Sequence, residues 1–213
     1  MKTRFIYRLL SVVLVLSASL VSAAPEYVYV SATNVRMRDI AATSGKIVAT
    51  LPIGSWCRVV AESDKNETLL GKTSRWYKVI TDKQEEGWIF GGLTQPAEST
   101  ERISAALQII NAQIEKQNNS TEDLMQTLTF TEETKEMASH SLEKAHLDTA
   151  FLQVLSHIYG TLAMTGKGND SKHPAVKNYP NVCYYHEPAG QYFVKSDAYW
   201  ELAEKYSDIV EAA

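Results

Sequence analysis

Four aromatic residues in the first half of the chain have the chemistry to anchor a ligand: Trp56, Trp76, Trp88 and Phe90. Along residues 56–61, apolar and mixed side chains alternate with a period of two, which predicts a strand with Cys57 and Val59 facing inward and Trp56 facing outward. Exposed aromatic side chains are common anchors of binding surfaces because they bury a large apolar area on contact. We therefore predict that the four residues bind a ligand. The alternative is that they belong to a core, or to an interface between two parts of the chain.

The two cysteines, Cys57 and Cys183, raise the question of a disulfide. In an oxidising compartment such a bond is chemically permitted, and it would join the two halves of the chain. The alternative is two separate buried thiols, because a disulfide requires the two sulfurs to meet in space. As a nucleophile, Cys183 would need a helix start and a distant later histidine, whereas it lies in a β-like stretch followed closely by His186. We expect no catalysis by Cys183.

The histidines do not have the spacing of metal ligands. His140, His146 and His157 are six and eleven residues apart, not three or four. The sequence also contains no His-Glu-x-x-His, Cys-x-x-Cys, Gly-x-Ser-x-Gly or Gly-rich phosphate motif. We predict no metal, no cofactor and no catalytic residue. Carboxylates are abundant, and their sequence spacing does not define their separation in space, so a hydrolase stays as an alternative.

The first 23 residues have the pattern of a cleavable signal peptide. Lys2, Arg4 and Arg8 precede an apolar run from 9 to 21, and small residues at 21–23 fit a signal peptidase site. The run is too short to span a bilayer, which takes about 20 residues. We predict a periplasmic or secreted protein that begins after Ala23 and has no membrane span once cleaved.

The charge of the exported chain excludes one class of partner. After cleavage it has 18 Lys and Arg against 25 Asp and Glu, a net charge of −7. Nucleic acids require a clustered positive face. We therefore expect no nucleic-acid binding.

The periodicity of the sequence divides the exported chain into two domains. From 26 to 95, five or six short β-rich runs are separated by Pro, Gly and polar turns, which predicts a small β-barrel. After Pro96 the period changes from two to about 3.6, which predicts a mainly α-helical bundle over 98–213. The expected fold class is therefore α+β and multidomain.

Several helix boundaries are predicted in the second domain. Ser120 is expected to begin a helix, with Asp123 three residues later as in a capping box. Thr131 is expected to open another helix, which either continues over about 132–164 or breaks near Lys144.

The strongest apolar stripe falls in the predicted third helix and marks it as the spine of the domain: Leu147, Phe151, Val154, Leu155, Ile158 and Leu162. Residues 182–195 form either a short hairpin or an irregular aromatic loop. Asp197 is expected to cap a last helix with Tyr199 facing inward.

Five motifs of the first domain resemble the bacterial SH3-like domain (SH3b, type 3) in order and spacing. They are Asn34-Val35-Arg36, Gly45 to Leu51, Gly54, Trp76-Tyr77-Lys78-Val79 and Gly87-Trp88-Ile89. The resemblance covers about a third of the chain, and it departs from the family where Met37-Arg38-Asp39 replaces the usual Gly-Pro after the arginine.

This resemblance implies an SH3-like β-barrel that recognises a ligand and performs no chemistry. Domains of the family occur as binding modules in exported proteins, so the expected partner is peptidoglycan or an envelope protein. We therefore expect an exported, non-enzymatic envelope protein. The alternative is a cell-wall hydrolase with a catalytic site in the helical half.

Overall fold

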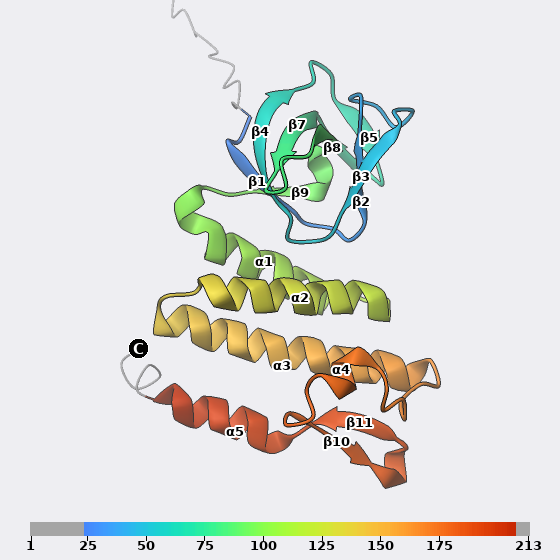
Figure 1. The fold of residues 1–213 in the computed structure, drawn as a ribbon, viewed down its shortest axis with the longest axis vertical. Coiled ribbons are helices and arrows are strands. Elements are labelled where there is room, and N and C mark those ends of the chain that lie inside the picture. The colour runs from blue at the N-terminus through green and yellow to red at the C-terminus, as the bar shows by residue number, and fades with distance from the viewer. Residues whose placement is uncertain (1–23, 208–213) are drawn as a thin grey trace, which may run out of the picture.

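The computed structural model describes residues 24–207, and the predicted signal peptide, 1–23, lies outside the described residues. The fold is α+β: an antiparallel sheet lies at one end, and helices stacked in layers follow it (Figure 1). Within the described residues, no helix is long and apolar enough to cross a membrane.

The first part of the chain forms nine short strands. They are β1 Tyr27–Val30, β2 Val35–Arg38, β3 Ile47–Leu51, β4 Trp56–Glu62, β5 Glu67–Leu69, β6 Lys72–Ser74, β7 Trp76–Thr81, β8 Glu86–Phe90 and β9 Thr94–Pro96. Seven of them form one antiparallel sheet in the order β3-β2-β8-β7-β4-β1-β9, while β5 and β6 pair as a separate hairpin.

The sheet has an apolar core of its own. Alternate residues of its strands point to one side, as a period of two requires, and gather in one buried cluster: Val28, Val30, Val35, Met37, Leu51, Cys57, Val79 and Ile89. Cys57 is fully buried among them, so the predicted inward direction of this residue is confirmed.

The second part of the chain consists of five helices and a hairpin. The helices are α1 Arg102–Glu115, α2 Thr121–Met137, α3 Ser141–Met164, α4 Pro174–Lys177 and α5 Ser196–Lys205. The hairpin pairs β10 Cys183–His186 with β11 Gln191–Val194, so residues 182–195 form a hairpin and not an irregular loop. Single 3-10 turns, η1 Gly91–Leu93, η2 Ser99–Glu101 and η3 Glu187–Ala189, complete the chain. Figure 1 shows α1, α2 and α3 stacked between the sheet and the layer of α5 and the hairpin.

The helix boundaries confirm one prediction and correct two. Ser120 caps α2 in a capping box with Asp123, as expected. Thr131 does not open a helix: it lies inside α2, where its hydroxyl donates to the Thr127 carbonyl and needs no other partner. The break falls at 138–140, and not near Lys144; the Glu143 carboxylate caps the start of α3 by accepting from the His140 backbone N–H at 3.3 Å.

Helix α3 is the spine of the helical part. All six residues of its predicted apolar stripe are buried, in a cluster that draws side chains from the other helices, from the hairpin and from the sheet. At the opposite end of the stack, α5 begins at Ser196, one residue before Asp197. It turns Ala198 inward and leaves Tyr199 exposed, which corrects the predicted inward direction of Tyr199.

A buried carboxylate joins three helical segments. Asp148 of α3 accepts hydrogen bonds from the Lys205 ammonium at 2.9 Å and the Tyr206 hydroxyl at 2.7 Å, and it pairs with Lys135 of α2 at 2.6 Å. Burial acts to raise the pKa of Asp148, but these three partners outweigh it and hold the pKa below its ordinary value. The carboxylate is therefore ionised in the folded protein at neutral pH.

The two cysteines are free thiols in different clusters. Cys57 lies in the sheet core, whereas Cys183 lies on β10, on the side of α3 away from the sheet (Figure 1). The disulfide interpretation is therefore wrong, and the alternative of two separate buried thiols is correct. The layers of helices between the two residues keep the sulfurs apart.

Candidate functional site

Trp56 lies on the predicted face of its strand, but that face is covered. It points away from the sheet core that contains Cys57, yet only 9% of it is exposed. Its ring stacks on Tyr27 at 5.2 Å, meets Tyr29 edge-on at 4.6 Å, and has the Arg102 guanidinium 4.5 Å from its centroid. The prediction of Trp56 as an exposed ligand anchor is therefore wrong. The residue belongs to the interface between the sheet and the helices.

Gly54 brings the loop before β4 close to α2 at the same interface. This residue has a φ of +82°, in the left-handed region that glycine occupies without strain. A Cβ at this position would lie 2.1 Å from the ring of Phe130 on α2. The loop before β4 therefore needs glycine both for its backbone conformation and for its contact with α2.

A polar seam ties the loop between β1 and β2 to the helices. The Thr33 hydroxyl donates to the Asp123 carboxylate, and the Gln126 amide donates to the Asn34 side chain at 3.2 Å. On α1, the Gln113 amide donates to the Ser31 carbonyl at 3.3 Å. The loop at 31–34 is thus positioned by α1 and α2 as well as by the sheet.

This loop forms one wall of a groove on the outer face of the sheet. The groove has a volume of about 350 Å³, within the range of small-ligand sites. Three groups of residues line it: loop and β2 residues Ala32, Thr33, Asn34, Val35, Arg36 and Arg38; Thr43, Leu69 and Leu70; and Trp76, Phe90 and Leu93.

Two of the predicted ligand-binding residues form the floor of the groove. Trp76 of β7 and Phe90 of β8 are cross-strand partners, and their rings meet edge-on with centroids 5.8 Å apart. Both are almost fully buried although they point away from the sheet core, because the β5–β6 hairpin packs over them. The indole N–H of Trp76 donates to the Glu67 carboxylate of that hairpin. Sequence reasoning does not predict this cover, and ligand binding by the two rings stays a prediction.

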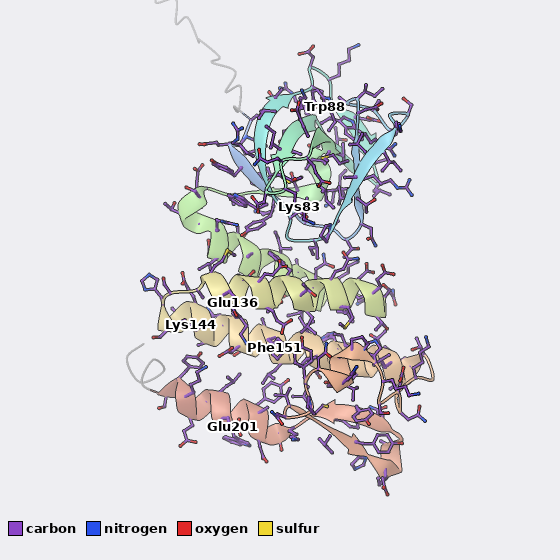
Figure 2. The ribbon with its side chains drawn as sticks, viewed as in Figure 1. Lys83, Trp88, Glu136, Lys144, Phe151 and Glu201 are labelled. Carbon is purple, nitrogen blue, oxygen red and sulfur yellow. The ribbon has the colours of Figure 1, made fainter. Side chains whose placement is uncertain are left out.

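The groove opens where two strands part. Within the described sheet, β2 joins β8 at a single pair, Arg38 and Trp88. Further along β8, Phe90 has no partner on β2, and the space between the strands becomes the groove. Trp88 is partly exposed beside Arg38, on the part of the sheet far from the helices (Figure 2). It adjoins the groove but is not part of its lining.

The rim of the groove is cationic. Arg36 and Arg38 are two residues apart on β2, so both lie on its outer face, opposite to Val35 and Met37 in the core. A guanidinium nitrogen of Arg38 donates to the Gly45 carbonyl at 2.5 Å, which holds this side chain in place. Arg36 is exposed, and in the part of the chain from 24 to 207 neither arginine pairs with a carboxylate.

A leucine at position 70, at the edge of the groove, is unfavourable for the folded state in two ways. With Gly71 it forms the tip of the β5–β6 hairpin, and both residues have positive φ, 53° and 74°. A two-residue turn of this type favours Asn or Gly, because a Cβ strains the left-handed conformation. The Leu70 side chain is also 77% exposed. Neither the turn nor packing accounts for a leucine here.

Other hollows lie elsewhere on the described surface, and two along the helices, of about 500 and 370 Å³, have no Trp, Tyr or Phe in their lining. Another hollow of about 280 Å³ lies between the sheet and α2, and its rim mixes Lys83 with the carboxylates of Asp82, Glu85 and Glu133. Figure 2 shows Lys83 on the side of the sheet nearer to the helices. Across the described 24–207 segment, no group of three or more His, Cys, Asp or Glu side chains could hold a metal ion.

The groove offers contacts of several chemical kinds. Its lining contains aromatic rings, aliphatic side chains, two guanidinium groups and small polar side chains, but no Cys, His, Asp or Glu. A hydroxyl nucleophile needs an adjacent base, and the lining supplies none to Thr33 or Thr43. Comparison of the chain with protein-family models, with curated proteins and with solved structures finds no match.

Arg36 and Leu70 are among the groove residues that sequence reasoning missed as site residues. Arg36 lies in a motif of the SH3-like resemblance, and its spacing from Arg38 already indicates a shared face on a strand. Leu70 stands next to Gly71 between two short polar strands, where an apolar residue at a turn is unusual. Both signals are present in the sequence, but only the fold shows that they converge on Trp76 and Phe90.

Proposed function

We propose that this chain is an exported, non-enzymatic envelope protein that binds a peptide in the groove between β2, β8 and the β5–β6 hairpin. The peptide belongs to the cell wall or to an envelope protein. One observation carries the proposal: the groove combines an aromatic floor with a cationic rim that has no carboxylate partner in the described part of the chain, and its lining contains no acid or base. Such a site is suited to recognition and lacks the groups that catalysis requires.

The SH3-like resemblance supports the same reading. Two of its motifs, at 34–36 and 76–79, supply Arg36 and Trp76 to the groove. That the seven-stranded sheet is an SH3-like barrel is part of this proposal, as is the periplasmic or secreted location that the signal pattern predicts. The net charge of −7 after cleavage also favours a wall or protein partner over nucleic acid.

The helical part has a scaffolding role in this proposal. It covers Trp56, Tyr29 and Ile53 of the sheet and fixes the loop at 31–34 through the polar seam. The position of one groove wall therefore depends on the helices, although the lining comes from the first part of the chain.

A sedimentation assay with purified peptidoglycan tests the proposal. The chain from residue 24 onward should be retained in the pellet without releasing soluble fragments. Leu70→Asn should reduce the retention about tenfold, because the apolar contact of Leu70 with the ligand is lost while the turn is preserved. The matched control is Leu142→Asn, which changes a 52% exposed leucine on α3 and should leave retention unchanged.

Two results would contradict the proposal. Release of soluble fragments would favour the hydrolase alternative. Equal retention of the wild-type chain and Leu70→Asn would show that the groove does not bind the wall. The same comparison with envelope extracts would then show whether the groove binds a protein partner.

A further inference from the structure

We infer that the groove recognises the free carboxylate at the C-terminal end of a peptide, with Arg36 as the residue that binds it. This inference rests on the proposed function of the groove as a peptide site and names the feature of the peptide that is read.

The state of the two rim arginines supports a carboxylate ligand. Arg36 is exposed and, in the described part of the chain, has no carboxylate partner, so its planar guanidinium is available for a bidentate contact. Its cross-strand partner on β3 is Thr50, which carries no negative charge. Arg38 is held by the Gly45 carbonyl and adds a second fixed positive charge at the same rim.

One carboxylate, Glu67 of the hairpin, lies near this rim without forming an ion pair with either arginine. It accepts instead from the Trp76 indole and from the Thr43 hydroxyl, both of which belong to groove-lining residues. It does not line the groove. In a chain of net charge −7 after cleavage, two unpaired arginines over an apolar floor therefore form a local positive site.

The apolar surfaces favour a chain end over an internal acidic side chain. The C-terminal residue of a peptide presents its carboxylate and its side chain on the same carbon, so one residue can contact Arg36 and also place a small apolar group against Leu70 and Leu93. An internal Asp or Glu would instead bring peptide groups over the aromatic floor, where they find few polar partners. A volume of about 350 Å³ suits a short chain end.

Titration calorimetry with four synthetic peptides tests this inference. The probes are acetyl-Lys-Ala-Ala with a free carboxylate or a carboxamide, each with both alanines in the L or the D form. The free acid should bind at least about tenfold more tightly than its amide, since hydrogen bonds to charged groups are the strong ones. The stereoisomer that binds shows the source: L for a protein C-terminus, D for a wall peptide.

Arg36 variants complete the test. Arg36→Gln should remove the preference for the acid, and Arg36→Lys should restore only part of it, because an ammonium cannot make the bidentate contact. The control is Arg58→Gln, an exposed arginine on β4 outside the groove, which should keep the preference. The wild-type preference should also weaken with added salt.

The failures of the inference and of the proposed function are distinct. If the acid and the amide bind equally while Leu70→Asn weakens both, the groove binds peptides but does not read the carboxylate. Retention on peptidoglycan with no binding of any of the four probes would also overturn the chain-end inference. An unchanged preference in Arg36→Gln would assign the carboxylate to another residue.

Discussion

The outward face of the sheet has two aromatic regions that are covered by different parts of the chain. The region of Trp56 and Tyr29 is sealed by α1 and α2 and joins the core of the helical part. The region of Trp76 and Phe90 is covered by a hairpin of two three-residue strands, which leaves a groove beside it. The same period-two pattern thus yields a structural interface in one place and a candidate binding site in the other, depending on what packs over it.

The largest effect is expected from removing the sealed tryptophan. Trp56→Ala should lower the free energy of unfolding by about 3–5 kcal/mol, because a large buried ring is replaced by a cavity at the interface. Urea denaturation followed by far-UV circular dichroism measures this change. The control is Trp200→Ala, which removes a 73% exposed ring on α5 and should change stability by less than about 0.5 kcal/mol. A small effect of Trp56→Ala would show that the helices do not seal this face.

A smaller loss is expected at Gly54. Gly54→Ala should destabilise the protein by about 2–4 kcal/mol, because its Cβ adds backbone strain and also meets the Phe130 ring. Gly71→Ala is the matched control: it has a similar φ of +74° but open space around its Cβ, so it should cost about 1 kcal/mol. The difference between the two midpoints of denaturation reports the contact between sheet and α2. Equal losses would mean that this contact is loose.

Acid should destabilise the helical part through Asp148. The pKa of Asp148 is lowered in the folded protein, so its contribution to stability is present above its ordinary pKa and is lost as the pH falls through the lower folded value. Asp148→Asn should therefore cost about 1–2 kcal/mol at pH 7 and flatten the decline of stability below about pH 4. An unchanged slope of stability against pH in Asp148→Asn would assign the acid sensitivity to other carboxylates.

The smallest change in stability is expected at the tip of the β5–β6 hairpin. Leu70→Asn should leave the free energy of unfolding unchanged or raise it by up to about 1 kcal/mol, because asparagine tolerates the left-handed conformation at the hairpin tip. Thermal denaturation measures this shift. A clear loss of stability would mean that the leucine packs in the fold, and the argument for a ligand contact would lose its basis.

The sequence predicts what local patterns determine. The period of two places Cys57 inside the sheet, the capping box begins α2 at Ser120, and the apolar stripe from Leu147 to Leu162 identifies α3 as the spine. Each of these follows from the geometry of one element and its own side chains.

The rest depends on contacts between elements distant in the chain. Alternation places Trp56 on the outer face of β4, but only the packing of α1 and α2 shows that this face is closed. The break between α2 and α3 falls at 138–140, where the Glu143 carboxylate accepts from the His140 backbone N–H. Histidine at the cap position is a weaker sequence signal than serine or threonine. The groove needs the parting of β2 from β8 and the hairpin tip together, and neither is visible in one segment.

The two separate thiols can each report the local unfolding of one part of the protein. Burial, with a further contribution from Asp82, raises the pKa of Cys57 to about 12, so in the folded state this sulfur is a protonated, unreactive group. Cys183 is shielded in the other cluster. A thiol reagent therefore reacts with each only when its own surroundings open, and the two labelling rates measure the local unfolding of the sheet and of the helical stack independently. In an oxidising medium the same separation means that a Cys57–Cys183 bond can form only in a chain that has lost its fold.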